Sequence, residues 1–127
     1  MKQEAMLNPL CLDSVCAGFA YAMGMPAPQK AQVPAEALTA YVDHHFGGEK
    51  ANRVFLYHPD AVAEWIFRKY PEFLYEAMYR TELELPLQAV MPSVTPVCFG
   101  TLYTGAQPEV HGIRKYEKPV IKIDTLF

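Results

Sequence analysis

RVFLYHPD, residues 53–60, begins the part of the sequence that decides the expected fold. RVFLY is a short apolar run bounded by Pro59 and Asp60, which is typical of a strand buried on both faces. Helical spacing follows over residues 61–79, with an interruption near Pro71. LPLQAVMP, residues 85–92, reads as a second strand and leads into a helix closed by Gly105. This order of strand, helix, strand and helix predicts an α/β fold with a partial parallel sheet and flanking helices.

The flanking parts of the chain complete this picture. Apolar side chains at helical spacing predict a helix from Pro9 to Met25, and a second from Ala35 to Phe46, closed by Gly47 and Gly48. KPVIKID, residues 118–124, reads as a third, peripheral strand. We therefore expect a helical N-terminal extension over residues 1–50 and an α/β portion over residues 51–127.

Composition limits the classes of partner. The 127 residues are 51% hydrophobic and carry a net charge of -3, with no basic run that could follow a phosphate backbone. Nucleic acid is not expected as a partner, and neither is a membrane, because no apolar stretch is long enough to span one. Three cysteines without a CxxC pair predict no disulfide framework and favour the cytoplasm. Homo-oligomerisation stays open.

Asp60 and Thr95 are the polar residues that follow the two expected strands. Ligands in open α/β sheets gather at the carboxyl ends of strands, where a carboxylate can reach a metal and a hydroxyl can act as a nucleophile. Each residue also has an ordinary structural interpretation. Asp60 precedes a helix, and Thr95 precedes Pro96, so both fit helix N-caps.

PSVTPVCFGTLYTGAQPEVHGI, residues 92–113, resembles the nucleophile segment of the alkaline phosphatase superfamily, in particular its nucleotide pyrophosphatase and phosphodiesterase branch. That branch has a threonine nucleophile at the start of a helix, a TG pair whose threonine lies nine residues later, and then a P-E-x-H-G-I turn. Thr95, Thr104 with Gly105, and residues 108–113 fall at those positions. The superfamily also has a metal-binding aspartate after the preceding strand, and Asp60 occupies the matching place.

The resemblance implies hydrolysis of small phosphate mono- or diesters through a phosphoryl-threonine intermediate. It implies two divalent metal ions, usually zinc, with Thr95 as nucleophile and with Thr95 and Asp60 as ligands of one metal. His111 belongs to the same pattern, but the family uses it to brace the turn. The superfamily's remaining metal ligands lie further along the chain, so we expect complete activity only in a chain that continues beyond Phe127.

Two departures keep the substrate open. The phosphodiesterase branch has a phosphate-binding asparagine five residues after the motif histidine, and this chain has Tyr116 there. A phenol can donate one hydrogen bond to a phosphate oxygen, so Tyr116 is a candidate substrate-binding residue. TPVCF, residues 95–99, lacks the pattern of a sulfatase nucleophile. The alternatives are an inactive structural or interaction module, or another chemistry of the superfamily such as phosphonate hydrolysis or phosphomutase transfer.

The remaining candidates have structural explanations. His44 and His45 are adjacent on a helix and point about 100 degrees apart, so they cannot share a metal as an i, i+4 pair can. His58 is near enough in sequence to hydrogen-bond at the Asp60 site. Cys98 lies one turn after Thr95 and has no neighbouring base in the sequence, which favours a buried, unreactive thiol.

Overall fold

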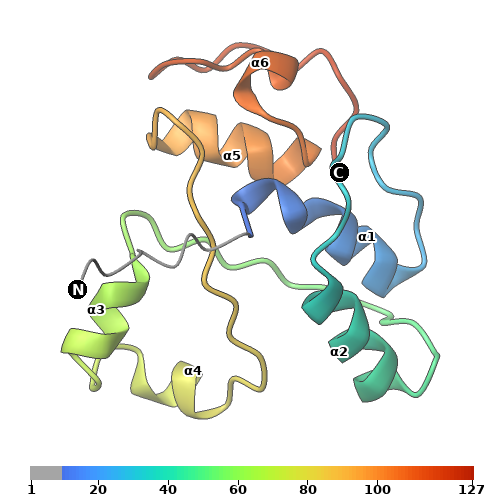
Figure 1. Ribbon diagram of the computed structural model, residues 1–127, viewed down its shortest axis with the longest axis vertical. Coiled ribbons are helices and arrows are strands. Elements are labelled where there is room, and N and C mark those ends of the chain that lie inside the picture. Colours follow the sequence, from blue (N-terminus) through green and yellow to red (C-terminus); the bar gives the residue numbers. More distant parts are fainter. Residues whose placement is uncertain (1–9) are drawn as a thin grey trace, which may run out of the picture.

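A computed structural model describes residues 10–127 (Figure 1). The first residue of the helix expected from Pro9 lies outside the described part. The elements in chain order are η1 (Leu12–Ser14), α1 (Cys16–Met23), α2 (Glu36–Phe46), α3 (Glu64–Lys69), α4 (Tyr75–Tyr79), α5 (Thr95–Thr104) and α6 (Pro108–His111). None of these helices is of a length and apolarity that would let it span a membrane.

The expected parallel sheet is absent from residues 10–127, so the α/β prediction is wrong. The only strand-like pairing there is one isolated parallel bridge between Cys11 and Gln88. It consists of Leu12 N–H donating to the Gln88 carbonyl at 2.9 Å and Gln88 N–H donating to the Leu10 carbonyl at 3.0 Å. A single bridge aligns two segments without building a sheet.

The segment expected to form the first strand shows why the sheet prediction fails. Residues 53–57 run alone across the molecule (Figure 1), and no backbone–backbone hydrogen bond within the described part involves them. Phe55 and Tyr57 are 87% and 78% exposed, so this run is not buried on both faces. An apolar, branched and aromatic sequence favours an extended chain, but a strand also needs a neighbouring backbone to pair with.

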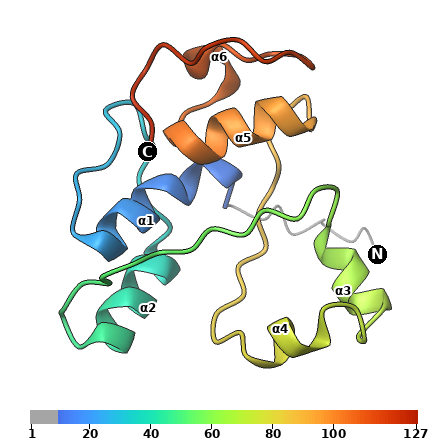
Figure 2. The same cartoon turned by 180° about the vertical axis from the view of Figure 1, so that it is seen from behind.

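The core lies where the N-terminal helices meet α5. Figures 1 and 2 show η1 and α1 beneath α5, with α6 on the other side of α5. Buried Val90, Val97 and Ile113 form one cluster, and half-buried Cys11, Val94, Cys98 and Ile121 pack against it. Val90 precedes α5, Val97 belongs to α5, and Ile113 follows α6, so the cluster packs these three segments together. This packing orients the start of α5.

The N-terminal part of the chain is tied into the same core. Ala35 N–H donates to the Ser14 carbonyl at 2.9 Å, and Gln32 N–H donates to the Gly105 carbonyl at 2.8 Å. The helix expected to end at Phe46 is confirmed as α2, and Gly47 follows it in the left-handed conformation at φ 59°. The domain boundary expected near residue 50 stays a prediction.

The helices α3 and α4 form an arm apart from the core. Neither helix contacts another helix of the described part, and both views show them away from α1, α2 and α5 (Figures 1 and 2). The interruption expected near Pro71 is confirmed, because α3 ends at Lys69 and the helix resumes as α4 at Tyr75. Proline lacks an N–H and clashes with the preceding turn, which explains the break.

Candidate functional site

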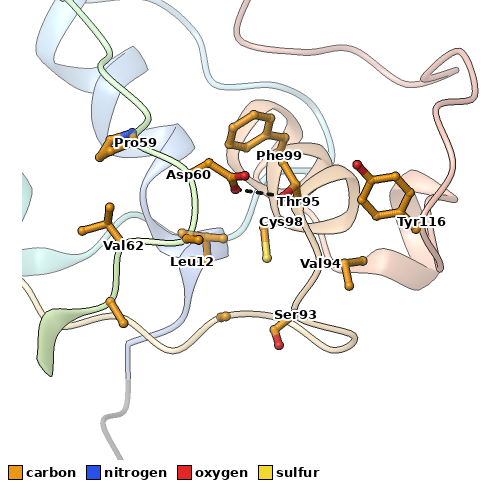
Figure 3. Close-up of a pocket in the computed structure, with 13 residues that line it drawn as sticks. Leu12, Pro59, Asp60, Val62, Ser93, Val94, Thr95, Cys98, Phe99 and Tyr116 are labelled. Atoms are coloured by element: carbon orange, nitrogen blue, oxygen red, sulfur yellow. Dashed lines mark hydrogen bonds between the residues drawn. The ribbon is translucent and has the colours of Figure 1, made fainter. Parts of the chain in front are cut away.

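Asp60 and Thr95 meet at the start of α5. The Thr95 hydroxyl donates a hydrogen bond to Asp60 Oδ1 at 2.9 Å, across 35 residues of sequence (Figure 3). Thr95 is half-buried and Asp60 is exposed, so solvent reaches both groups. The pair of residues expected to act together therefore lies in contact, while their catalytic roles stay predictions.

Neither side chain caps a helix, although both were open to that interpretation. The N-cap of α3 is Ala63, three residues beyond Asp60, and the N-cap of α5 is Val94. Neither helix has a side-chain cap hydrogen bond. Thr95 is instead the first residue of α5, followed by Pro96. The Asp60–Thr95 hydrogen bond therefore replaces the two local capping bonds that the sequence allowed.

The backbone beside Asp60 is strained. Ala61 has a φ of 54°, in the left-handed region that residues with a Cβ rarely adopt. This conformation turns the chain between the extended segment that ends at Asp60 and the approach to α3. Backbone strain of this kind often accompanies sites that orient a functional side chain.

A cavity of about 620 Å³ surrounds the pair. Ser93, Thr95 and Asp60 provide hydroxyl and carboxylate groups, and Leu12, Val62, Val94 and Phe99 are among its apolar lining residues. Tyr116 also lines this cavity, and its hydroxyl points toward α5 (Figure 3). The three predicted site residues thus share one cavity, in the size range of small-molecule sites, roughly 300–1,000 Å³.

Cys98 and His58 also lie near this cavity. Cys98 lines it, and burial raises the pKa of its thiol, so the reactive thiolate is disfavoured. The His58 ring packs 5.3 Å from the Phe99 ring and 5.7 Å from the Tyr103 ring, measured between centroids. His58 makes aromatic contacts rather than a hydrogen bond with Asp60.

His111 braces the turn after α5. Its Nε2 lies 3.0 Å from the buried Thr101 hydroxyl, and its Nδ1 accepts a hydrogen bond from Ile113 N–H at 3.2 Å. An Nδ1 that accepts carries no proton, so Nε2–H donates to Thr101 in the neutral ring. Burial lowers the pKa of His111, which favours this neutral form. His111 is thus a structural residue, as expected.

The donor set does not fit a complete two-zinc centre. Asp60 and Thr95 supply two oxygen ligands that one cation could share. Across residues 10–127, however, no group of three or more His, Cys, Asp or Glu side chains could hold a metal ion. Zinc sites in proteins use three or four protein ligands, usually including nitrogen or sulfur. The expected zinc ions stay a prediction that needs ligands beyond this pair.

Sequence reasoning missed two lining residues. Ser93 lies two residues before Thr95 and lines the same cavity, and Phe99 follows Thr95 by one helical turn. The helical spacing of Phe99 is the signal that could have placed it beside Thr95, since residues i and i+4 share a helix face. Ser93 carried no such signal, because its placement depends on the loop before α5.

No family model, curated protein or solved structure matches this chain.

Proposed function

We propose that this chain carries the nucleophile site of a phosphoric ester hydrolase that acts through a phosphoryl-threonine on Thr95. The observation that supports it is the hydrogen bond from the Thr95 hydroxyl to the Asp60 carboxylate, 2.9 Å long, inside a small-molecule-sized cavity. The resemblance of residues 92–113 to the alkaline phosphatase superfamily names the same threonine, and Asp60 precedes this segment at the place that matches the superfamily's metal-binding aspartate. The two arguments agree, because ligands of one metal must lie close together and the hydrogen bond brings Thr95 and Asp60 into contact.

Asp60 is suited to accept the nucleophile's proton. In the first step the Thr95 oxygen bonds to phosphorus, the bond from phosphorus to the leaving oxygen breaks, and the hydroxyl proton passes to Asp60 and then to the leaving oxygen. In the second step water attacks phosphorus and gives its proton to Asp60, which returns it to the departing Thr95 oxygen. Atoms and charges balance over the two steps.

The start of α5 favours an anion next to this nucleophile. Thr95 opens a ten-residue helix, whose dipole places partial positive charge at that end. The Tyr116 hydroxyl can donate one hydrogen bond to a phosphoryl oxygen. Tyr116 is thus a proposed binding residue in place of the expected asparagine, and mono- and diesters both stay candidate substrates.

The wider assignments are proposals of the same kind. The substrate would be a small phosphoester, and two divalent ions, usually zinc in this superfamily, would need ligands in addition to Asp60 and Thr95. A cytoplasmic setting is supported by the free thiols of Cys11, Cys16 and Cys98.

The test is to trap the phosphoryl-enzyme. The 127-residue chain is incubated with p-nitrophenyl phosphate or its bis ester, with and without zinc, and quenched in acid. We expect a phosphoryl group on the Thr95 peptide by mass spectrometry. Thr95→Val abolishes that modification, and Asp60→Asn slows its formation by about 100-fold or more, since general bases contribute at least that much.

Thr39→Val is the matched control, because Thr39 is a half-buried threonine, like Thr95, and its hydroxyl donates locally to the Glu36 carbonyl. This variant should label Thr95 like the parent chain. Absence of phosphothreonine with both esters, with and without zinc, would reject the hydrolase proposal and favour the interaction-module alternative. Release of nitrophenol that survives Thr95→Val would reject Thr95 as the nucleophile.

A further inference from the structure

A second cavity of about 360 Å³ opens beside Thr95. Thr95, Phe99 and Tyr116 line this cavity as well as the first one, so the two cavities adjoin at the proposed nucleophile. A group attached to a phosphorus atom at Thr95 would therefore lie at the border of the second cavity.

The chemistry of the second cavity differs from that of the first. Its walls are aromatic and aliphatic: Pro96, Phe99, Tyr103, Ile113, Tyr116, Pro119 and Ile121. The Phe99 and Tyr103 rings lie 5.7 Å apart at an interplanar angle of 36°, within the range in which aromatic rings attract one another. A third ring would find the same kind of neighbour there. The Asp60 carboxylate and the Ser93 hydroxyl belong to the first cavity alone.

Charge in the second cavity also favours a neutral occupant. Its charged lining residues are Glu117 and Lys118, which are adjacent and of opposite sign. Glu117 is paired with Lys115, whose Nζ lies 3.8 Å from Glu117 Oε2, so the glutamate offers little attraction to a cationic substituent. Desolvation would penalise a charged group among these apolar walls.

We infer that this cavity binds a neutral aromatic substituent of the phosphoester, with the phosphoryl group at Thr95 and the start of α5. The inference rests on the proposed function for the placement of phosphorus. It adds the substrate class, which is aryl esters rather than esters of small or charged alcohols.

The test compares phenylphosphonate with methylphosphonate, two stable anions that differ in the substituent alone. Binding to the 127-residue chain is followed by NMR titration of backbone amides. Both ligands should shift the Thr95 amide. Phenylphosphonate should in addition shift the amides of Tyr103 and Ile121 and bind at least about fivefold tighter, because a buried phenyl ring gains apolar burial and ring contacts.

Ile121→Ala and Val120→Ala are the matched pair of variants. Ile121 lines the second cavity, whereas its neighbour Val120 is 84% exposed and does not line it. Ile121→Ala should reduce the preference for phenylphosphonate by about threefold and leave methylphosphonate binding unchanged. Val120→Ala should change neither affinity.

The outcomes separate this inference from the proposed function. If methylphosphonate shifts Thr95 but phenylphosphonate binds no tighter, or leaves Tyr103 and Ile121 unshifted, the aryl site is refuted and the nucleophile site stands. If neither ligand shifts Thr95, both proposals fail. Should Ile121→Ala not fold, the shifts of Tyr103 and Ile121 in the parent chain decide the matter.

Discussion

Gly105 lies where the end of α5 packs closely against α1 and the loop that contains Ala31. The substitution Gly105→Ala adds one methyl group at this contact and so tests the packing. It ends α5 with a φ of 69°, and its N–H donates to the Thr101 carbonyl at 2.8 Å. A Cβ built at this position would lie 2.6 Å from Ala31 Cβ, 2.9 Å from Ala31 Cα and 3.0 Å from Cys16 Cβ. Gly105→Ala would therefore force apart α5, α1 and the loop that contains Ala31.

The expected loss of stability has two parts. The left-handed backbone costs an alanine about 1–2 kcal/mol relative to glycine. Overpacking against Ala31 and Cys16 adds about 1–3 kcal/mol, because one of the close atoms belongs to the backbone and cannot rotate away. Gly105→Ala should thus lower the free energy of unfolding by about 2–5 kcal/mol, measured by urea denaturation with an unchanged m-value.

Gly47→Ala is the matched control. Gly47 also ends a helix in the left-handed conformation, at φ 59°, but no atom lies within 4 Å of a Cβ built there. Both variants therefore share the backbone strain and the change in unfolded-chain entropy. Only Gly105→Ala adds a steric clash with Ala31 and Cys16. If Gly105→Ala is no more destabilising than Gly47→Ala, the packing of the Ala31 loop against the end of α5 is incorrect.

Three further predictions concern the site and its support. Thr101→Val should lower the free energy of unfolding, measured in urea, by about 1–3 kcal/mol, because it leaves the His111 donor buried without a partner. The control Thr39→Val, in α2, should lower it by less than about 0.5 kcal/mol. Burial holds the pKa of His111 below its ordinary value of 6.5, so the unfolded chain binds a proton first as the pH falls, and stability should decline from about pH 7 to pH 5. His111→Gln should flatten that decline and the exposed His44→Gln should not; a decline of equal slope in both would contradict the buried neutral ring. In a double-mutant cycle of Thr95→Val and Asp60→Asn, we expect a coupling energy of about 0.5–1.5 kcal/mol in the free energy of unfolding. This value lies below the range of roughly 1.5–3 kcal/mol for hydrogen bonds to charged groups, because Asp60 is exposed. A coupling of zero would show that the contact is not formed in solution.

Local sequence signals placed two helices correctly. The helix that ends before Gly47 and the helix from Thr95 to Gly105 both appear within about a residue of the expected bounds. Glycine in the left-handed conformation and apolar residues at helical spacing act over a few residues, so a single sequence carries them. The sheet prediction failed because strand pairing depends on segments that are distant in the sequence. Strand-like composition at residues 53–57 says nothing about whether another backbone lies alongside.

In the candidate site, too, some features follow from the sequence and others only from the tertiary structure. The sequence by itself determined which side chains are present: a threonine and a proline opening a helix, an aspartate ending an apolar run, and a tyrosine beyond the motif histidine. The tertiary structure decided that Thr95 and Asp60 bond to each other rather than to their own helices, and that Phe99 and Tyr116 line both cavities with them. Capping depends on backbone atoms two or three residues away, whereas a contact across 35 residues depends on how the core orients α5.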